Sequence, residues 1–400
     1  MSIGCVLLFW YNGAMPDTIE VKIEKIAAGG AGLARHGGQS VFVDGAIPGE
    51  TVSCRATENH HSWIRAELLE IIEASPDRVL PLCGLYCVCG GCNMQHLSYT
   101  AQIAAKTGIL KESFMRIGNC RVPEPQVFPA ETTAPAAWEY RNRMQFHVLR
   151  QPNTLLGLKI RKNAGIIPIS DCPIADPGIR EMVQGKTQMA IPPERDRFTV
   201  FARNGLFLQE GGKARGKTRL LNQELTLDAG VFFQSNGAKL EKLIADLQGI
   251  AGGACQKDAP IADLYCGVGT FAAFLGHLFP HIDLVEENKT ALALARENLK
   301  SHESAAFYAQ RSENWAKSSL KPQHYGFIVA DPPRQGFDPA LASLLAKNGP
   351  PLLAYVSCDP ATLARDSKIL MEGGYELADL HWYDFYPQTA HIESLAVFAR

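Results

Sequence analysis

A cysteine between an apolar strand and a helix start is the clearest candidate nucleophile of this chain. Leu352–Ser357 has the pattern of a buried β-strand, and Cys358 follows it directly, ahead of a stretch from Pro360 that reads as a helix. Backbone N–H groups and the dipole at a helix N-terminus favour the thiolate form of a cysteine. A single cysteine is more often a small buried apolar residue, so this position alone predicts no activity.

Two glycines in a strand-to-helix turn predict a binding site for a nucleoside cofactor. Gly267 and Gly269 follow the apolar strand Ile261–Tyr265, and glycines there let the backbone approach a ligand closely. The pattern D-x-x-C-G-x-G resembles the first motif of S-adenosylmethionine-dependent methyltransferases. About twenty residues on, Glu286 ends the next strand, where a carboxylate can accept both hydroxyls of a ribose. Alternatively, this strand end only begins a helix, for which Asn288 is a suitable N-cap.

A third strand end, Asp331-Pro332-Pro333-Arg334, suggests a rival chemistry. D-P-P resembles the motif by which amino-methyltransferases hold an exocyclic nitrogen of a base. Those enzymes usually have an aromatic residue after the prolines, whereas this chain has Arg334. A base amino-methyltransferase is therefore one alternative, although it leaves Cys358 unexplained.

Three further motifs resemble the signatures of the RNA uracil-5-methyltransferases. They are S-C-D-P-A-T-L-A-R-D at 357–366, T-A-H-I-E-S at 389–394 and F-F-Q-S-N at 232–236. The resemblance covers nearly the whole chain and departs at Asp359, where many members have Asn, and at Thr270, where some have Asn. It implies an RNA methyltransferase of EC class 2.1.1 with Cys358 as nucleophile and Glu393 as base. It also implies that S-adenosylmethionine is bound by Gln234, Tyr265, Gly267, Gly269, Glu286 and Asp331.

The chemistry of uracil explains why such residue types are needed. C5 of uracil is a poor nucleophile, but addition of a thiolate to C6 turns the C4–C5 unit into an enolate that can attack a sulfonium methyl group. A base must then remove the C5 proton so that the cysteine can leave, and a carboxylate suits that task. A stacked uridine is inaccessible, so it has to be flipped out of its helix.

Four cysteines outside these motifs predict a metal site. Cys83, Cys89 and Cys92 lie in one short loop, and Cys172 lies far downstream, followed by a proline. Structural zinc usually uses two C-x2-C pairs, whereas a distant last cysteine before proline is typical of iron–sulfur ligation. Members of the resembling family hold a [4Fe–4S] cluster with this spacing, which skips Cys87.

Pattern and length together predict three domains after a short extension. Four hundred residues, 46% of them hydrophobic, exceed one ordinary core. Residues 1–14 look like a non-native extension before Met15. Short alternating strands at 15–75 predict an OB-type β-barrel, which by resemblance is a TRAM domain. We expect residues 76–225 to form a mixed central domain, which by the resemblance holds the iron–sulfur cluster, with a helix at about 98–117 that packs on the catalytic domain. Alternating strands and helices at 226–400 predict a Rossmann-like α/β domain with a parallel sheet.

Charge and cysteine usage bear on partners and location. Residues 141–220 contain fifteen Lys or Arg against six Asp or Glu, which suits either a surface that grips RNA phosphates or a solvated face. Eleven cysteines, no export signal and no apolar stretch of about 18 residues predict a cytoplasmic protein away from membranes, and we expect a monomer. Bacterial tRNA members of the family generally lack the barrel and the cluster, so the resemblance favours 23S rRNA over tRNA. A non-catalytic iron–sulfur RNA-binding protein is the alternative from another class.

Overall fold

The computed structural model describes most of the chain, and the proposed extension at residues 1–14 lies outside the described part. The described residues are 18–120, 122–130, 137–150, 154–161, 164–186, 191, 194–253, 258–320 and 324–400. The chain divides into two compact units, each described here by itself. Unit 1 comprises Met1–Ile109, Leu158–Ile167 and Pro387–His391, and unit 2 comprises Leu110–Gly157, Pro168–Tyr386 and Ile392–Arg400.

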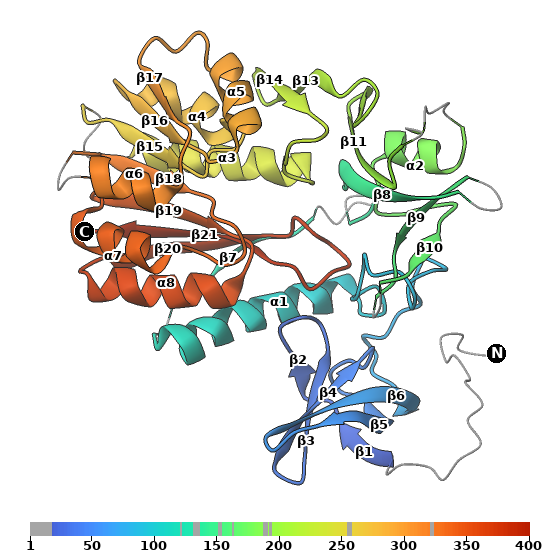
Figure 1. Ribbon diagram of the computed structural model, residues 1–400. Helices are drawn as coiled ribbons and strands as arrows, with labels where there is room; N and C mark the ends of the chain where they lie inside the picture. The colour runs from blue at the N-terminus through green and yellow to red at the C-terminus, as the bar shows by residue number, and fades with distance from the viewer. Residues whose placement is uncertain are drawn as a thin grey trace. The chain divides into compact units, whose positions relative to one another are not determined.

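Unit 1 contains a six-stranded sheet in the order β1-β5-β6-β4-β3-β2, shown in blue in Figure 1. Alternate apolar residues such as Val21, Val41 and Val43 point into one core, as the period-two pattern requires. Strands β4 and β6 pair in parallel, and the other neighbours pair antiparallel. The predicted strand-rich N-terminal domain is therefore present. Its strands are β1 (Thr18–Lys22), β2 (Lys25–Ile26), β3 (Gly32–His36), β4 (Gln39–Asp44), β5 (Thr51–Asn59) and β6 (Trp63–Glu73).

The middle of the chain forms one long helix, a second sheet and a hairpin. Helix α1 (Tyr99–Ser113) continues into a π-helical turn, Phe114–Gly118. In unit 2 this turn lies so close to helix α8 (Pro360–Glu372) that a Cβ added at Gly118 would be 3.2 Å from the Ala364 carbonyl oxygen. The second sheet has the order β10-β9-β8-β11-β12. Its elements and neighbours are β8 (Arg143–Leu149), β9 (Leu155–Lys159), β10 (Ile166–Pro168), α2 (Pro177–Val183), β11 (Arg197–Arg203), β12 (Leu206–Gln209), and the hairpin β13 (Arg215–Leu220) and β14 (Gln223–Asp228).

An eight-stranded sheet dominates unit 2, in the order β17-β16-β15-β18-β19-β21-β20-β7. Its first five strands run parallel, as expected, but β21 runs antiparallel to both of its neighbours, so the expectation of a purely parallel sheet is wrong. The reason is the short link between β20 and β21, because a parallel return needs a crossover of a dozen or more residues. The strands are β7 (Gln126–Phe128), β15 (Ile261–Leu264), β16 (Ile282–Val285), β17 (Ala305–Tyr308), β18 (Phe327–Ala330), β19 (Leu352–Ser357), β20 (Glu376–Tyr383) and β21 (Glu393–Ala399).

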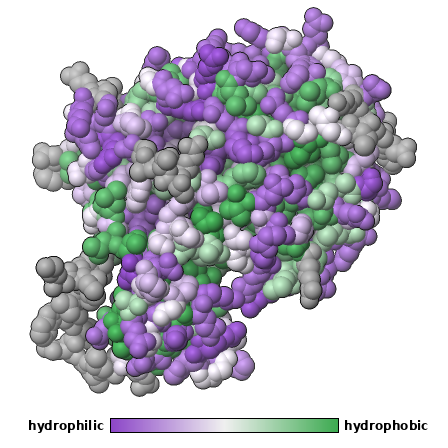
Figure 2. Space-filling view, turned by 180° about the vertical axis from the view of Figure 1, so that it is seen from behind, coloured by the Kyte–Doolittle hydropathy of each residue, from purple (hydrophilic) through white to green (hydrophobic). Residues whose placement is uncertain are grey.

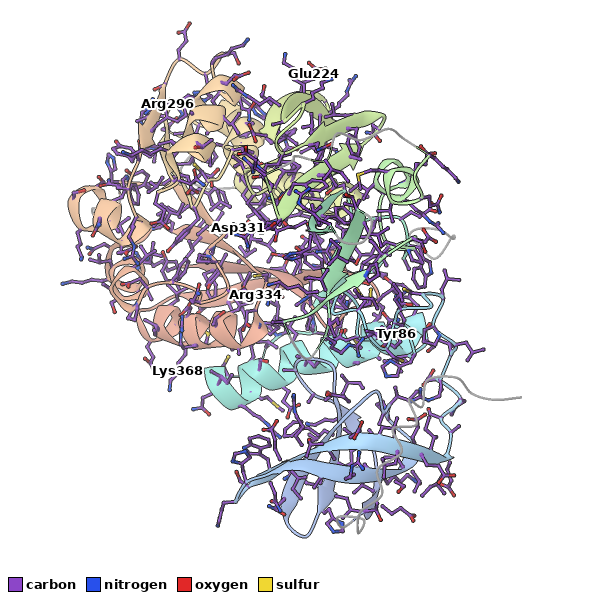
Figure 3. All side chains as sticks on the ribbon, turned by 45° about the vertical axis from the view of Figure 1, so that its right-hand side comes forward. Tyr86, Glu224, Arg296, Asp331, Arg334 and Lys368 are labelled. Carbon is purple, nitrogen blue, oxygen red and sulfur yellow. The ribbon has the colours of Figure 1, made fainter. Side chains whose placement is uncertain are left out.

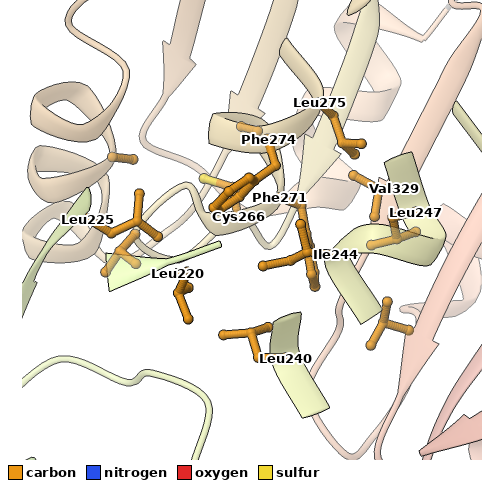
Figure 4. Close-up of a cluster of buried hydrophobic side chains, with 14 of the residues drawn as sticks. Leu220, Leu225, Leu240, Ile244, Leu247, Cys266, Phe271, Phe274, Leu275 and Val329 are labelled. Atoms are coloured by element: carbon orange, nitrogen blue, oxygen red, sulfur yellow. The ribbon is translucent and has the colours of Figure 1, made fainter. Parts of the chain in front are cut away.

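Helices cover the strands of this sheet, and four central strands, β15, β16, β18 and β21, are buried along almost their whole length. Leu240, Ile244 and Leu247 of α3 pack with Phe271 and Phe274 of α4 in the cluster of Figure 4. On the face seen in Figure 2, hydrophilic and apolar residues are interspersed. No helix of the described residues has both the length and the apolar character that crossing a membrane requires. The helices are α3 (Gly237–Gly252), α4 (Thr270–Leu275) with the 3-10 turn Gly276–Leu278, α5 (Lys289–Asn298), α6 (Ser312–Ser319), α7 (Pro339–Asn348) and α8 (Pro360–Glu372).

Candidate active site

The turn after β15 has the backbone shape of a ligand-binding turn. Tyr265, Gly267 and Gly269 all have positive φ angles, of 61°, 55° and 78°. A non-glycine residue in this region costs roughly 1–3 kcal/mol, so the shape of the turn is imposed at Tyr265 against a local preference. A Cβ added at Gly269 would lie 2.8 Å from Leu299 Cδ1, whereas one added at Gly267 would meet nothing within 4 Å. Gly269 is thus needed for packing, and Gly267 leaves open space beside the backbone.

Glu286 ties the end of β16 to that turn. Its Oε2 accepts the N–H of Gly267 at 3.0 Å, and its Oε1 accepts the N–H of Asn288 at 2.7 Å. The amide oxygen of Asn288 caps α5 by accepting the N–H groups of Thr290 and Ala291. The helix cap therefore belongs to Asn288, and the Glu286 carboxylate faces the glycine turn, each oxygen keeping a further lone pair for a ligand.

Gln234 and Asp331 meet although they are far apart in the sequence. Gln234 Nε2 donates to Asp331 Oδ2 at 3.1 Å, from the segment before α3 to the loop after β18, where Figure 3 labels Asp331 and Arg334. Burial raises the pKa of Asp331 to about 7, and the bond from Gln234 opposes that rise. Two buried oxygens here have no hydrogen-bond partner among the described residues, Gln234 Oε1 and Asp263 Oδ1. Polar atoms left in this state are ready acceptors for a polar ligand.

The antiparallel strand β21 brings Glu393 next to Cys358. In its register with β19, Ser357 stands opposite Ser394, so the next step of the ladder would set Cys358 against Glu393. Residues so placed have Cα atoms about 4.5–5.5 Å apart. Glu393 is only 1% exposed, and its Oε1 has no partner within the described part of the chain. Burial, and then the charge of Asp331, raise the pKa of Glu393 well above its usual range, and Arg334 opposes them.

The Cys358 thiol does not have the lowered pKa that its position at a helix start predicts. Burial, and then the charges of Glu393 and Asp331, raise its pKa to about 12, while Arg334 lowers it. The first N–H groups of α8 are also not available to the sulfur. Pro360 has none, and Asp359 Oδ1 accepts those of Ala361 and Thr362 at 2.9 and 3.0 Å. The expectation of a stabilised thiolate was therefore wrong for this structure.

Two residues of this neighbourhood were missed as site residues by sequence reasoning. Tyr386 is partly buried, and burial, then the charges of Glu393, Cys358 and Asp331, raise the pKa of its hydroxyl. Arg334 acts in the opposite sense on Cys358 and Glu393. In the sequence, Arg334 stands out only as a departure from the aromatic residue that usually follows the two prolines. A cation three residues after the predicted site residue Asp331 is the signal that could have identified it.

The predicted cluster ligands do not form a metal site in the described residues, in which no three His, Cys, Asp or Glu side chains are placed to hold a metal ion. Cys83, Cys89 and Cys92 belong to unit 1, and Cys172 belongs to unit 2. A [4Fe–4S] cluster needs its thiolates around one point. The iron–sulfur prediction is therefore not confirmed by the described residues.

Comparisons with known proteins agree with the fold and the motifs. Residues 225–400 match the family model described as tRNA (Uracil-5-)-methyltransferase, and residues 16–69 match that of the TRAM domain. An uncharacterized RNA methyltransferase of Treponema denticola is 31% identical, covering 95% of this chain and 98% of the relative. The 23S rRNA (uracil(1939)-C(5))-methyltransferase RlmD of Methylococcus capsulatus is 32% identical over 96% of this chain and 97% of the relative.

A solved structure shows the same fold over almost all of the chain. It is the Pyrococcus abyssi tRNA (uracil-54, C5)-methyltransferase in complex with S-adenosyl-L-homocysteine, with a TM-score of 0.72 and 22% identity. The match covers 95% of this chain and 100% of that one. With relatives above 30% identity over nearly their full length and matching models for both the catalytic and the TRAM regions, this chain belongs to the RNA uracil-5-methyltransferase family, the S-adenosylmethionine-dependent enzymes of EC class 2.1.1.

Proposed function

We propose that this enzyme methylates C5 of one uridine in 23S rRNA, through a covalent bond between Cys358 and uracil C6. The observation that supports the proposal is the register of β19 and β21, in which Ser357 pairs with Ser394, so that Cys358 and the buried Glu393 are the next residues along the two strands. Methylation of a base nitrogen does not require a nucleophilic thiol paired with a carboxylate. A protein that only binds RNA does not require this pair either.

The residues at the strand ends suit S-adenosylmethionine, which supplies an electrophilic methyl group when bound. Gly267 leaves room for close approach, and Glu286 can accept the ribose hydroxyls with its remaining lone pairs. Gln234 Oε1 is a buried acceptor, and the same amide donates to the Asp331 carboxylate. We assign cofactor binding to these residues together with Tyr265 and Gly269.

Cys358 then forms the S–C6 bond, and the C5–C6 π electrons move into an enolate of the C4–C5 unit. The thiol loses its proton to solvent before this step, and Arg334 favours that loss because it lowers the pKa of the thiol. After methyl transfer to C5, Glu393 takes the C5 proton. The electrons of that C–H bond restore the C5–C6 double bond, and the thiolate leaves. A carboxylate with a raised pKa is a stronger base, which suits Glu393 to this role.

The choice of RNA follows from the relatives. Those named as 23S rRNA enzymes are 29–32% identical to this chain, whereas the tRNA enzyme of known structure is 22% identical and shows the fold alone. That tRNA enzyme matches over 95% of this chain, so the barrel by itself does not select rRNA. The test is methylation of unmodified 23S rRNA and tRNA transcripts with labelled cofactor, followed by nucleoside mapping. We expect 5-methyluridine in the 23S rRNA, and its appearance in tRNA alone would overturn the assignment.

The iron–sulfur cluster stays a prediction of the resemblance. Its support is the spacing of Cys83, Cys89 and Cys92 in one loop, with Cys172 as the fourth thiol. No catalytic step depends on it. Iron and sulfide analysis of protein purified without oxygen tests it directly.

A further inference from the structure

A polar pocket of about 230 Å³ lies wholly within unit 1, apart from the residues assigned above. Five of its eleven lining residues are glycines, the others are polar or charged, and His391 supplies the one ring among them. The barrel contributes Asp44 and Arg65, and the cysteine loop contributes Asn93. Thr389 and His391 come from the segment that precedes Glu393 by only a few residues.

Asn93 fixes the shape of this pocket. Its Nδ2 donates to the Gly29 carbonyl oxygen of the barrel at 2.7 Å, and its Oδ1 accepts the N–H of Ala390 at 2.8 Å. A Cβ added at Gly30 would lie 2.6 Å from Asn93 Nδ2, so a glycine is needed there. One amide thus joins the barrel loop to the 387–391 segment, and the pocket is formed before any ligand arrives.

Two arginines give the pocket its positive charge. Arg161 packs over the Tyr86 ring at 5.0 Å and donates to the carbonyl oxygens of Tyr86 and Cys92. Its Nε is nevertheless buried without a hydrogen-bond partner in the part of the chain that the structure describes. Arg65 is exposed and has no recorded ion pair among those residues. Arg65 stands out in the barrel because residues 15–75 contain only five Lys or Arg against nine Asp or Glu.

We propose that this pocket, to which residues four and two positions before Glu393 contribute, binds a phosphodiester of the substrate RNA. The volume falls below the roughly 300 Å³ at which pockets for whole small molecules begin. A nucleobase site usually stacks the base on Phe, Tyr or Trp, and the ring of His391 is the single ring in this lining. Arginine donors and hydroxyl or amide groups are what phosphate oxygens bind. The proposal rests on RNA being the substrate, and it places one backbone contact next to the segment that leads to Glu393.

The test compares Arg65→Gln with Arg35→Gln in the full-length protein. Arg35 is also on the barrel, donates to Ser40 Oγ at 2.9 Å and does not line the pocket, so its loss changes the net charge equally. The dissociation constant of a 23S rRNA fragment is measured from low to moderate salt. Loss of one phosphate contact reduces the slope of log K against log salt by about 0.7 for single-stranded RNA. We expect this change for Arg65→Gln, little change for Arg35→Gln, and retention of the slope by Arg65→Lys.

A second measurement locates the contact on the RNA. Fragments with a single uncharged methylphosphonate linkage are tested one position at a time around the uridine. At one linkage, the methylphosphonate should weaken binding of the RNA to the wild-type protein several-fold. The same methylphosphonate should leave binding to Arg65→Gln unchanged. Equal salt slopes for Arg65→Gln and the wild type, or the absence of such a linkage, would overturn the proposal. Methylation of the fragment by the wild type separates a wrong phosphate site from a wrong substrate. If the fragment is not a substrate, the wild type does not methylate it, whereas a wrong phosphate site leaves methylation intact.

Discussion

The raised pKa of Cys358 predicts an unreactive thiol in the protein without cofactor or RNA. An ordinary cysteine has a pKa of 9.0, and that of Cys358 is about 12, which lowers the thiolate fraction at pH 8 about a thousandfold. Alkylation requires the thiolate, so iodoacetamide should modify Cys358 about a thousandfold more slowly than a free thiol such as glutathione in the same tube. Because Glu393 is the charge that most raises this pKa, Glu393→Gln should speed the reaction. Arg334→Gln should slow it, because Arg334 lowers the pKa.

The assay follows the Cys358 peptide by mass spectrometry between pH 7 and 10. Poor access to the sulfur would slow alkylation at every pH equally, whereas a raised pKa makes the rate climb about tenfold per pH unit with no plateau. The slope thus separates the two causes. A plateau near pH 8 to 9, or the opposite order of the two variants, would refute the electrostatic reasoning.

Three further predictions concern the base, the cluster and a buried carboxyl. Glu393→Gln should accumulate a methylated protein–RNA adduct on unfluorinated RNA, because an amide cannot take the C5 proton; normal product release would remove Glu393 as the base. If the cluster forms, Cys83→Ser should lower the iron content and the stability of anaerobic protein, and Cys87→Ser should change neither; zinc in place of iron would contradict the prediction. Burial raises the pKa of Asp263 to about 8. The folded protein therefore keeps a proton on this carboxyl that the unfolded chain loses above about pH 4. As a result, this carboxyl lowers the free energy of unfolding as the pH rises from 4 to 8. In urea titrations, the free energy of unfolding of Asp263→Asn should therefore fall less between pH 5 and 8 than that of the wild type. The same fall in both proteins would contradict the raised pKa of Asp263.

The local motifs were predictable because each lies at the end of a recognisable strand. Apolar runs followed by Gly267, Glu286, Asp331 and Cys358 define the carboxyl edge of a parallel sheet, where ligand sites are expected. The strand-rich N-terminal region was likewise predictable, since its alternating apolar residues fill one core.

The position of β21 was not predictable from its own residues. Strand β21 is apolar along its length, as a parallel central strand would be, and only the short link from β20 makes it antiparallel. Glu393 was thus assigned by resemblance, while the physical reason for its place beside Cys358 appears only in the register. The raised pKa of Cys358 was equally hidden, because it depends on carboxylates that come from other strands.

The covalent bond between Cys358 and uracil is tested most directly with RNA that carries 5-fluorouridine at the target. Fluorine at C5 leaves no proton for Glu393 to remove, so the adduct should persist after methyl transfer. With labelled cofactor, the wild type should give a protein–RNA band in a denaturing gel, and digestion should place the RNA and the label on the peptide containing Cys358. Cys358→Ala should give no band while it retains its fold and its affinity for S-adenosylmethionine. A band that survives in Cys358→Ala, or a crosslink on another residue, would contradict the mechanism.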